Sequence, residues 1–354
     1  MTVLLLFYLS SLLLLASSSR RTIPYVFVLI VIGLSVVSFF YTPLQTSDLY
    51  RHYEYIVLYG EMGFDWVLEN RLNTNPLSHL LYYVFSFLGE PRFYASFSIF
   101  ITYGFIFLLL HRLSIFYGLS KKSIFLLSTF LLLNWNYLMI VSNCRIFMLY
   151  SIIAYFYYME FYENKCHKSA LIVYIASVFF HYGILLVVIP RFLLYLYRPT
   201  DRKVYLYMFL FILFYLFEGR YMLQSILVES VAEKIEVYKN YSTFGRLQYY
   251  NSIFTIVTCC FCIILGKLNI PQNRRYYILF FITIFILLLQ ISNYQVVYRE
   301  SNLIATLSVI LLTQVITGKK NSGLIRTILS IQMAITFVYY LVYEYQFIEF
   351  NFIV

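Results

Sequence analysis

Residues 93–111 read FYASFSIFITYGFIFLLLH, a stretch without a formally charged side chain at neutral pH. A bilayer-spanning helix needs roughly 20 predominantly apolar residues, so this stretch is long enough to cross a membrane. The rest of the chain has the same character, since 62% of its 354 residues are hydrophobic and only 12% are charged. Soluble domains average about 25% charged residues, so we expect an all-α polytopic membrane protein.

Similar apolar runs recur along the whole chain. They lie at 2–18, 24–41, 76–89, 123–141, 145–161, 169–198, 204–217, 252–266, 276–292, 302–317 and 325–343. Together they predict about 11–14 transmembrane or re-entrant helices in a single integral membrane domain, 1–354. We expect Met1–Ser19 to hold the first span and not a cleaved signal, because it lacks a basic leading region.

Basic residues gather at the ends of these runs and set the predicted orientation. The clusters are Arg20/Arg21, Arg112/Lys121/Lys122, Lys165/His167/Lys168, Arg198/Arg202/Lys203, Lys267/Arg274/Arg275 and Lys319/Lys320/Arg326. Lys and Arg accumulate in cytoplasmic loops. All six clusters are cytoplasmic only if the amino terminus is outside and the regions 76–111 and 169–198 are helical hairpins. We expect the second hairpin to be interrupted at His181, Gly183 and Pro190.

The same arrangement leaves three segments on the outer side. Two are sizeable extracytoplasmic loops, 42–75 and 218–250, and the third is the acidic, aromatic tail from Glu344 to Val354. Irregular backbone at membrane depth is tolerated where it lines a cavity buried in protein. The two hairpins are therefore candidate walls of a site.

The composition also argues against several classes of protein. The net charge of +10 would suggest nucleic-acid binding in a soluble protein, but membrane orientation accounts for it here, and we expect no nucleic-acid partner. The five cysteines have no spacing typical of a disulfide framework or a metal site. Because the chain has no Walker loop, dinucleotide-binding glycine pattern or HExxH motif, we expect neither a cofactor nor a metal.

Ionisable groups at the mouth of a span are costly, so each is a functional candidate. At 47–53, SDLYRHY places Asp48, Arg51 and His52 on one helix face, because positions i, i+3 and i+4 are neighbours. The stretch presents a carboxylate beside a cation, or else it is the solvated face of an interfacial helix. At 142–145, SNCR places Arg145 where a span begins on the outer side. This guanidinium can bind phosphate in a bidentate fork or snorkel to lipid headgroups.

Two further candidates lie later in the chain. His181, in FFHYG, can serve as a general base or a phosphate hydrogen-bond donor, or simply bond a backbone carbonyl at a helix break. Arg299 and Glu300, at another outer span entrance, are either a simple ion pair or a second anion ligand with its orienting carboxylate. Outer arginines, a histidine and an aspartate together suggest an anionic, lipid-linked substrate approached from outside. A pyrophosphate leaving group agrees with this set of residues, because arginine can stabilise the negative charge that develops on it.

The order of these motifs resembles the EpsG-type membrane proteins, the Wzy-like polymerases of bacterial capsule and exopolysaccharide synthesis. The matching elements are Ser47-Asp48-x-x-x-x-Tyr53-x-Tyr55, Asn75-Pro76-Leu77, Ser142-Asn143-Cys144-Arg145, Ile175-Ala176-Ser177-Val178-Phe179-Phe180-His181 and the region of Arg299. The chain departs from the family in two places. Asn75 replaces the glutamate of a Glu-Pro-Gly motif, and no Gln-Gly pair follows Arg145.

The resemblance implies a GT-C-like glycosyltransferase-type polymerase in the bacterial cytoplasmic membrane, with its active site facing outside. Such enzymes transfer a growing glycan from one undecaprenyl pyrophosphate carrier to the repeat unit on another, and a chain-length regulator is an implied partner. On this hypothesis Arg145, Arg299 and Arg51 bind pyrophosphate. His181 or Asp48 deprotonates the acceptor hydroxyl.

In the same hypothesis Glu300 orients Arg299. Two other functions remain open. One is a different polyprenyl-phosphate-sugar-dependent GT-C glycosyltransferase, in which Asp48 or Asp65 holds a metal ion. The other is a lipid-linked oligosaccharide flippase or transporter, which would bind near the bilayer midplane and often shows inverted repeats. The charged candidates here cluster at outer helix ends, and no paired repeat is visible.

Overall fold

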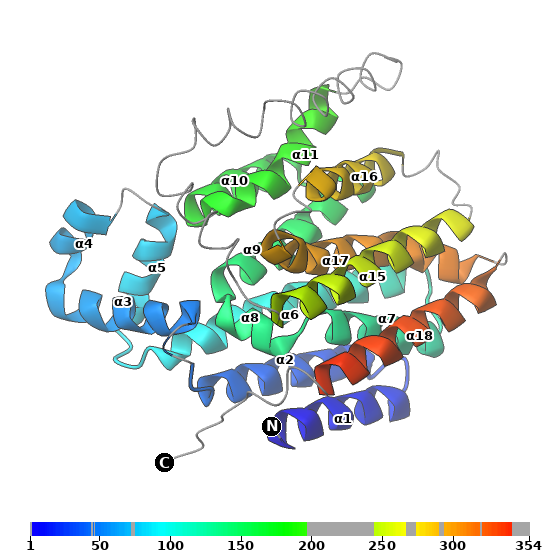
Figure 1. The fold of residues 1–354 in the computed structure, drawn as a ribbon, viewed down its shortest axis with the longest axis horizontal. Helices are drawn as coiled ribbons and strands as arrows, with labels where there is room; N and C mark the ends of the chain where they lie inside the picture. The colour runs from blue at the N-terminus through cyan, green and yellow to red at the C-terminus, as the bar shows by residue number, and fades with distance from the viewer. Residues whose placement is uncertain are drawn as a thin grey trace.

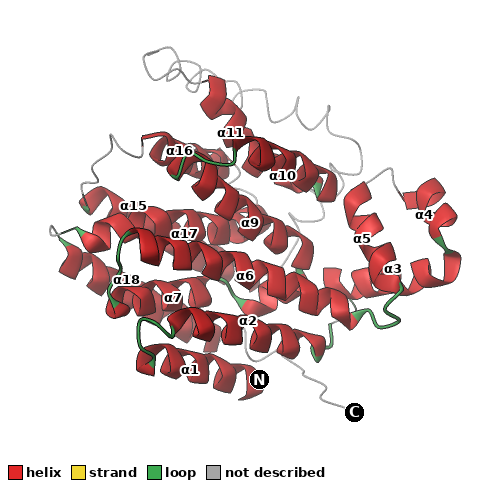
Figure 2. Ribbon diagram, turned by 180° about the vertical axis from the view of Figure 1, so that it is seen from behind, coloured by secondary structure: helices red, strands yellow, loops and turns green. Residues whose placement is uncertain are grey.

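The computed structural model describes residues 2–43, 45, 47–71, 75–196, 244–266, 274–289, 294–318 and 321–341. Over these residues the regular structure is helical and contains no strand (Figure 2). The helices are α1 (Thr2–Ser17), α2 (Ile23–Phe39), α3 (Asp48–Met62), α4 (Phe64–Arg71), α5 (Pro76–Ser86), α6 (Arg92–Phe116), α7 (Lys121–Asn134), α8 (Tyr137–Ser142), α9 (Cys144–Tyr157), α10 (His167–Phe180), α11 (Leu185–Leu196), α15 (Phe244–Leu265), α16 (Arg274–Leu289), α17 (Tyr294–Thr317) and α18 (Ser322–Tyr339). A π-helical turn, Tyr158–Tyr162, continues α9, and a 3-10 turn, Tyr182–Ile184, precedes α11.

Most of these helices lie side by side in a layered bundle, with α10 and α16 toward one edge and α1 at the other (Figures 1 and 2). Helix α17 is central, since it packs against α6, α7, α9, α15, α16 and α18. In the most apolar part of α17, 89% of the residues are buried, whereas the figure for α18, at the periphery, is 28%. The outer helices expose large apolar side chains such as Leu13 and Ile331. Apolar exposure of this kind is typical of a surface that faces lipid and not water.

Three helices in the described part of the chain are long and apolar enough to cross a membrane. They are Arg92–Phe116, Val296–Thr317 and Ser322–Tyr339. Five shorter apolar helices accompany them, at Leu6–Ser17, Ile23–Phe39, His167–Phe180, Tyr182–Leu194 and Tyr249–Leu265. The described part of the chain therefore has the helical, apolar architecture of a membrane protein, as the composition predicts.

The predicted run 123–141 is not one helix. It divides into α7 and α8 at Trp135–Asn136, where the Asn136 side chain accepts a hydrogen bond from the Leu138 N–H and begins the second helix. The Trp135 indole N–H donates to the Thr306 hydroxyl of α17 at 2.6 Å, which anchors the break. A backbone break inside the bundle is stable here because side chains satisfy the freed polar groups.

Helices α3, α4 and α5 form a separate unit beside one end of the bundle (Figure 1). The predicted outer loop 42–75 is thus largely folded: Ser47 caps α3, and Gly63, at φ +81°, joins α3 to α4. Helix α5 has 11 residues, about 16 Å in length, which is too short to cross a bilayer. The hairpin predicted for 76–111 turns between α5 and α6, where Gly89 has φ +69°.

The run 169–198 is interrupted at His181, as predicted. Helix α10 ends at Phe180, His181 is extended, and α11 begins at Leu185. Both helices return to one buried carboxylate. Glu160 accepts two hydrogen bonds from Arg191 of α11, at 2.9 and 3.0 Å, and lies 3.6 Å from His167 at the start of α10. The predicted interruption at Pro190 is wrong, because α11 continues through this residue.

Several predicted segments lie outside the described residues. These are the run 204–217, most of the loop 218–250 and the tail 344–354. Helix α15 begins at Phe244, so the last residues of the predicted second loop are helical. All five cysteines are described, and each is a free thiol.

Candidate functional site

The stretches selected from the sequence meet at one cavity, at the end of the bundle beside α3. Its lining residues are Asp48 and His52 of α3, Asn143, Arg145 and Ile146 at the start of α9, His181 between α10 and α11, and Arg299 of α17. The space among these residues is about 190 Å³, part of which is open to solvent. Four segments that are far apart in the sequence therefore supply a concentrated set of ionisable groups.

Arg145 occupies the first turn of α9, where unpaired backbone N–H groups give the helix a partial positive charge. Within the described residues its side chain has neither a hydrogen-bond partner nor an ion-pair partner. A guanidinium offers five donors in a fork that matches phosphate or carboxylate oxygens. Arg145 thus combines a lining position, a full charge and unused donors, which is the arrangement an anionic ligand requires.

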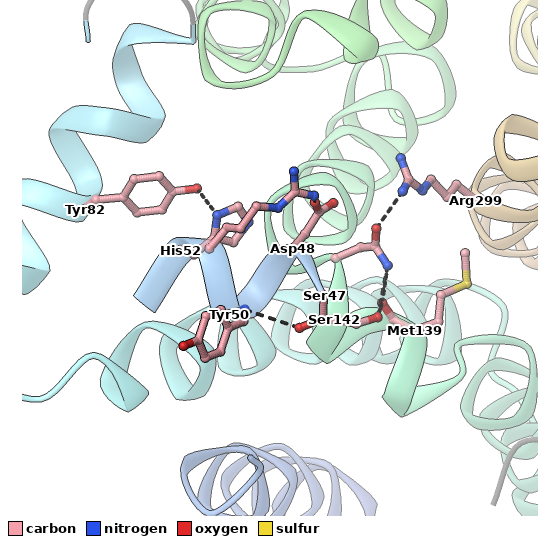
Figure 3. Close-up of polar contacts among 10 residues, drawn as sticks. Ser47, Asp48, Tyr50, His52, Tyr82, Met139, Ser142 and Arg299 are labelled. Carbon is pink, nitrogen blue, oxygen red and sulfur yellow. Dashed lines mark hydrogen bonds and ion pairs between the residues drawn. The ribbon is translucent and has the colours of Figure 1, made fainter. Parts of the chain in front are cut away.

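Arg299 is oriented by a neutral side chain. Its guanidinium donates to Asn143 Oδ1 at 2.8 Å, and Asn143 donates in turn to the Ser142 hydroxyl at 3.0 Å (Figure 3). None of the ion pairs found among the described residues joins Glu300 to Arg299, so the orienting role of Glu300 stays a prediction. Glu300 is 3% exposed and does not line the cavity, since consecutive helical residues point about 100° apart. Because an amide holds Arg299, its charge is not cancelled at that contact.

His181 lines the cavity with one ring nitrogen already bonded. Its Nδ1 accepts the Gly183 N–H at 3.0 Å, so a neutral ring carries its proton on Nε2. A Cβ atom at Gly183 would lie 2.8 Å from His181 Cε1, so a larger residue at this position would displace the ring. The bond to a backbone group at the helix break is real, as the simpler interpretation of the sequence proposed, but it involves an N–H and not a carbonyl. The ring is thereby prepared to donate a hydrogen bond.

Asp48 and His52 lie one turn apart on α3, and both line the cavity (Figure 3). Arg51 pairs with Asp48 and is not a lining residue; its side chain is 59% exposed. The prediction that Arg51 contacts the bound anion is therefore not supported by its position. His52 is buried, and its Nδ1 lies 3.0 Å from the Tyr82 hydroxyl. Burial first, and then the charge of Arg145, hold the pKa of His52 well below its usual range, so this histidine is neutral at pH 7.

The sequence indicated Asp48, Arg145, His181 and Arg299 as site residues but gave no role to His52 or Asn143. A signal for His52 existed, because it follows Asp48 by four residues on the same helix face. Asn143 had no such signal, since its bond to Arg299 joins residues 156 positions apart. Comparisons with protein-family models, with curated proteins and with solved structures found no match.

Proposed function

We propose that this chain is a polysaccharide polymerase that joins oligosaccharide repeat units carried on undecaprenyl pyrophosphate. It would act at the outer face of a bacterial cytoplasmic membrane, with a lipid pyrophosphate as leaving group. The observation that carries the proposal is the convergence of two guanidinium groups, those of Arg145 and Arg299, on one cavity. Two such cations favour a ligand with more than one negative charge.

The lining of the cavity supports a charged headgroup as the ligand, because most of its residues carry ionisable side chains. A pyrophosphate group would contact these side chains from the part of the site that is open to solvent, with the glycan outside and the lipid tail in the bilayer. Such a site recognises the part that is common to every repeat unit.

In the proposed reaction the bond between the donor anomeric carbon and a pyrophosphate oxygen breaks, and its electron pair stays on the pyrophosphate. The acceptor hydroxyl oxygen forms the new bond to that carbon and releases its proton. Arg145 and Arg299 stabilise the charge that develops on the leaving group, a term worth about 3–4 kcal/mol for one well-placed donor.

The geometry favours Asp48 over His181 as the base that takes the proton. In the neutral His181 ring Nδ1 accepts the Gly183 N–H and Nε2 is protonated, so neither nitrogen is available to remove a proton. Asp48 presents a carboxylate to the same cavity, held from the solvent side by Arg51. His181 would instead donate its Nε2–H to a phosphate oxygen.

The test uses cells in which the gene is deleted. Lipid-linked saccharides are extracted from each leaflet and sized by gel electrophoresis and mass spectrometry, with the intact gene supplied on a plasmid as control. Single repeat units that accumulate on the outer leaflet support a polymerase. Units that are confined to the inner leaflet would refute it and indicate a flippase, and loss of activity on chelation would favour a metal-dependent glycosyltransferase.

A further inference from the structure

The turn between α10 and α11 is held by two side chains, one from the residue that precedes α5 and one from α5 itself, more than 100 residues earlier in the chain. Asn75 Oδ1 accepts the Tyr182 N–H at 3.0 Å, and the Ser78 hydroxyl donates to the Phe180 carbonyl. These two hydrogen bonds hold the peptide groups that precede and follow His181. Helices α5 and α10 are also in contact, so the bonds belong to a packed interface.

The break in the helix explains why such partners are needed. Ending α10 at Phe180 frees backbone groups that an uninterrupted helix would pair. The His181 N–H still donates to Ser177 at 3.0 Å, and the Ile184 N–H donates to the His181 carbonyl at 2.9 Å. The Phe180 carbonyl instead accepts from Ser78 of α5, and the Tyr182 N–H donates to Asn75, the residue before α5. Where little water is present, each such group must be satisfied for the break to persist.

The backbone of Asn75 is adapted to this contact. Asn75 has φ +50° and ψ +56°, a left-handed conformation that asparagine and glycine tolerate better than other residues. The following proline begins α5. Its left-handed turn and the start of α5 together fix where the amide oxygen of Asn75 lies.

We infer that Asn75 and Ser78 are positioning residues for His181. Only the chemical role of His181 in polymerisation rests on the proposed function. They fix the peptide planes on either side of the histidine, so that the Gly183 N–H reaches Nδ1 and the ring is held at the cavity that His181 lines. The α3–α5 unit thus contributes twice to the site: directly through Asp48 and indirectly through the turn between α10 and α11.

The test compares two substitutions of one residue. Asn75→Gly keeps a residue that tolerates positive φ but removes the acceptor, whereas Asn75→Asp restores an Oδ1 acceptor. Asn164→Gly is the matched control, because Asn164 also has positive φ, at 57°, and lies at the other end of the bundle, before α10. Two quantities are measured in membranes: polymer formation, and the rate at which diethyl pyrocarbonate modifies His181, read by peptide mass spectrometry with His111 as internal reference.

Asn75→Gly should lower polymer formation by up to about 100-fold, the effect of a misplacement of roughly 1 Å. It should also accelerate modification of His181 relative to His111, because the bond at Nδ1 loosens. Asn75→Asp should restore both quantities, and Asn164→Gly should change neither. Ser78→Ala provides an independent variant should Asn75→Gly fail to accumulate.

The two readouts separate this inference from the proposed function. Unchanged reactivity of His181 in both Asn75→Gly and Ser78→Ala would overturn the inference. Altered reactivity with undiminished polymer would support the positioning role and refute the part assigned to His181 in polymerisation.

Discussion

Replacing Arg145 with alanine should abolish most polymer formation while the protein remains folded in the membrane. The structure provides the reason for both halves of this expectation. Within the described residues Arg145 has no ion-pair partner, so its removal leaves no buried carboxylate without a counter-charge. What is lost is one of two cations that face the proposed leaving group. Loss of one such donor costs about 2.7–4 kcal/mol in the transition state, or a factor of about 10²–10³ in rate.

The assay is polymer formation from lipid-linked repeat units in membranes that contain equal amounts of each variant. Arg145→Lys keeps the charge but loses the planar fork, so its rate should lie between those of the wild type and Arg145→Ala. Arg92→Ala is the matched control, because Arg92 is also an arginine near the start of its helix, pairs with Glu90 at 2.7 Å and does not line the cavity. Wild-type polymer formation by Arg145→Ala would refute the assignment of the cavity to an anion.

Three further predictions concern other parts of the molecule. Gly183→Ala should reduce polymer formation by about 100-fold, because the new methyl group displaces the ring of His181. Gly104→Ala is the control, because its methyl group would meet no atom within 4 Å. Equal activity of the two variants would contradict a role for the position of the His181 ring. Burial first, and then nearby arginines, lower the pKa of His79 to about 4, so below pH 6.5 the unfolded chain binds a proton that the folded chain does not. The free energy of unfolding in detergent should therefore fall by up to about 1.4 kcal/mol for each pH unit between pH 6.5 and 4. His79→Gln should make this dependence on pH less steep, and an equally steep dependence in that variant would disprove the assignment to His79. Glu160→Gln leaves Arg191 buried without its carboxylate and should lower the free energy of unfolding by about 3–5 kcal/mol. Thermal unfolding checks this value, and the double variant Glu160→Leu/Arg191→Met should recover most of the loss if the unpaired charge is the cause.

The sequence by itself predicted the class of fold and the helix interruption at His181, but not the break at Trp135–Asn136. Transfer of apolar residues into lipid imposes long apolar runs, and polar residues inside those runs are costly enough to mark helix breaks, so both features can be recognised locally. The break at His181 followed from this reasoning. The continuation of α11 through Pro190 did not, because neighbouring structure can satisfy the groups that a proline frees.

The sequence also identified Asp48, Arg145, His181 and Arg299 as candidate site residues, since charged groups at the ends of apolar helices stand out against their surroundings. Their convergence on one cavity depended on the tertiary structure. The sequence alone could not show that contact, because it gives no distance between segments separated by a hundred residues.

Only the tertiary structure decided which partner each of these residues has. Asn143 accepts a hydrogen bond from Arg299, and Asn75, the residue before α5, holds the backbone beside His181. Neighbours on a helix point in different directions, so adjacency in the sequence did not predict either contact. Long-range hydrogen bonds depend on how helices cross and on which turn of one meets which turn of another. Those quantities are set by the packing of the whole bundle and leave no local pattern in the chain.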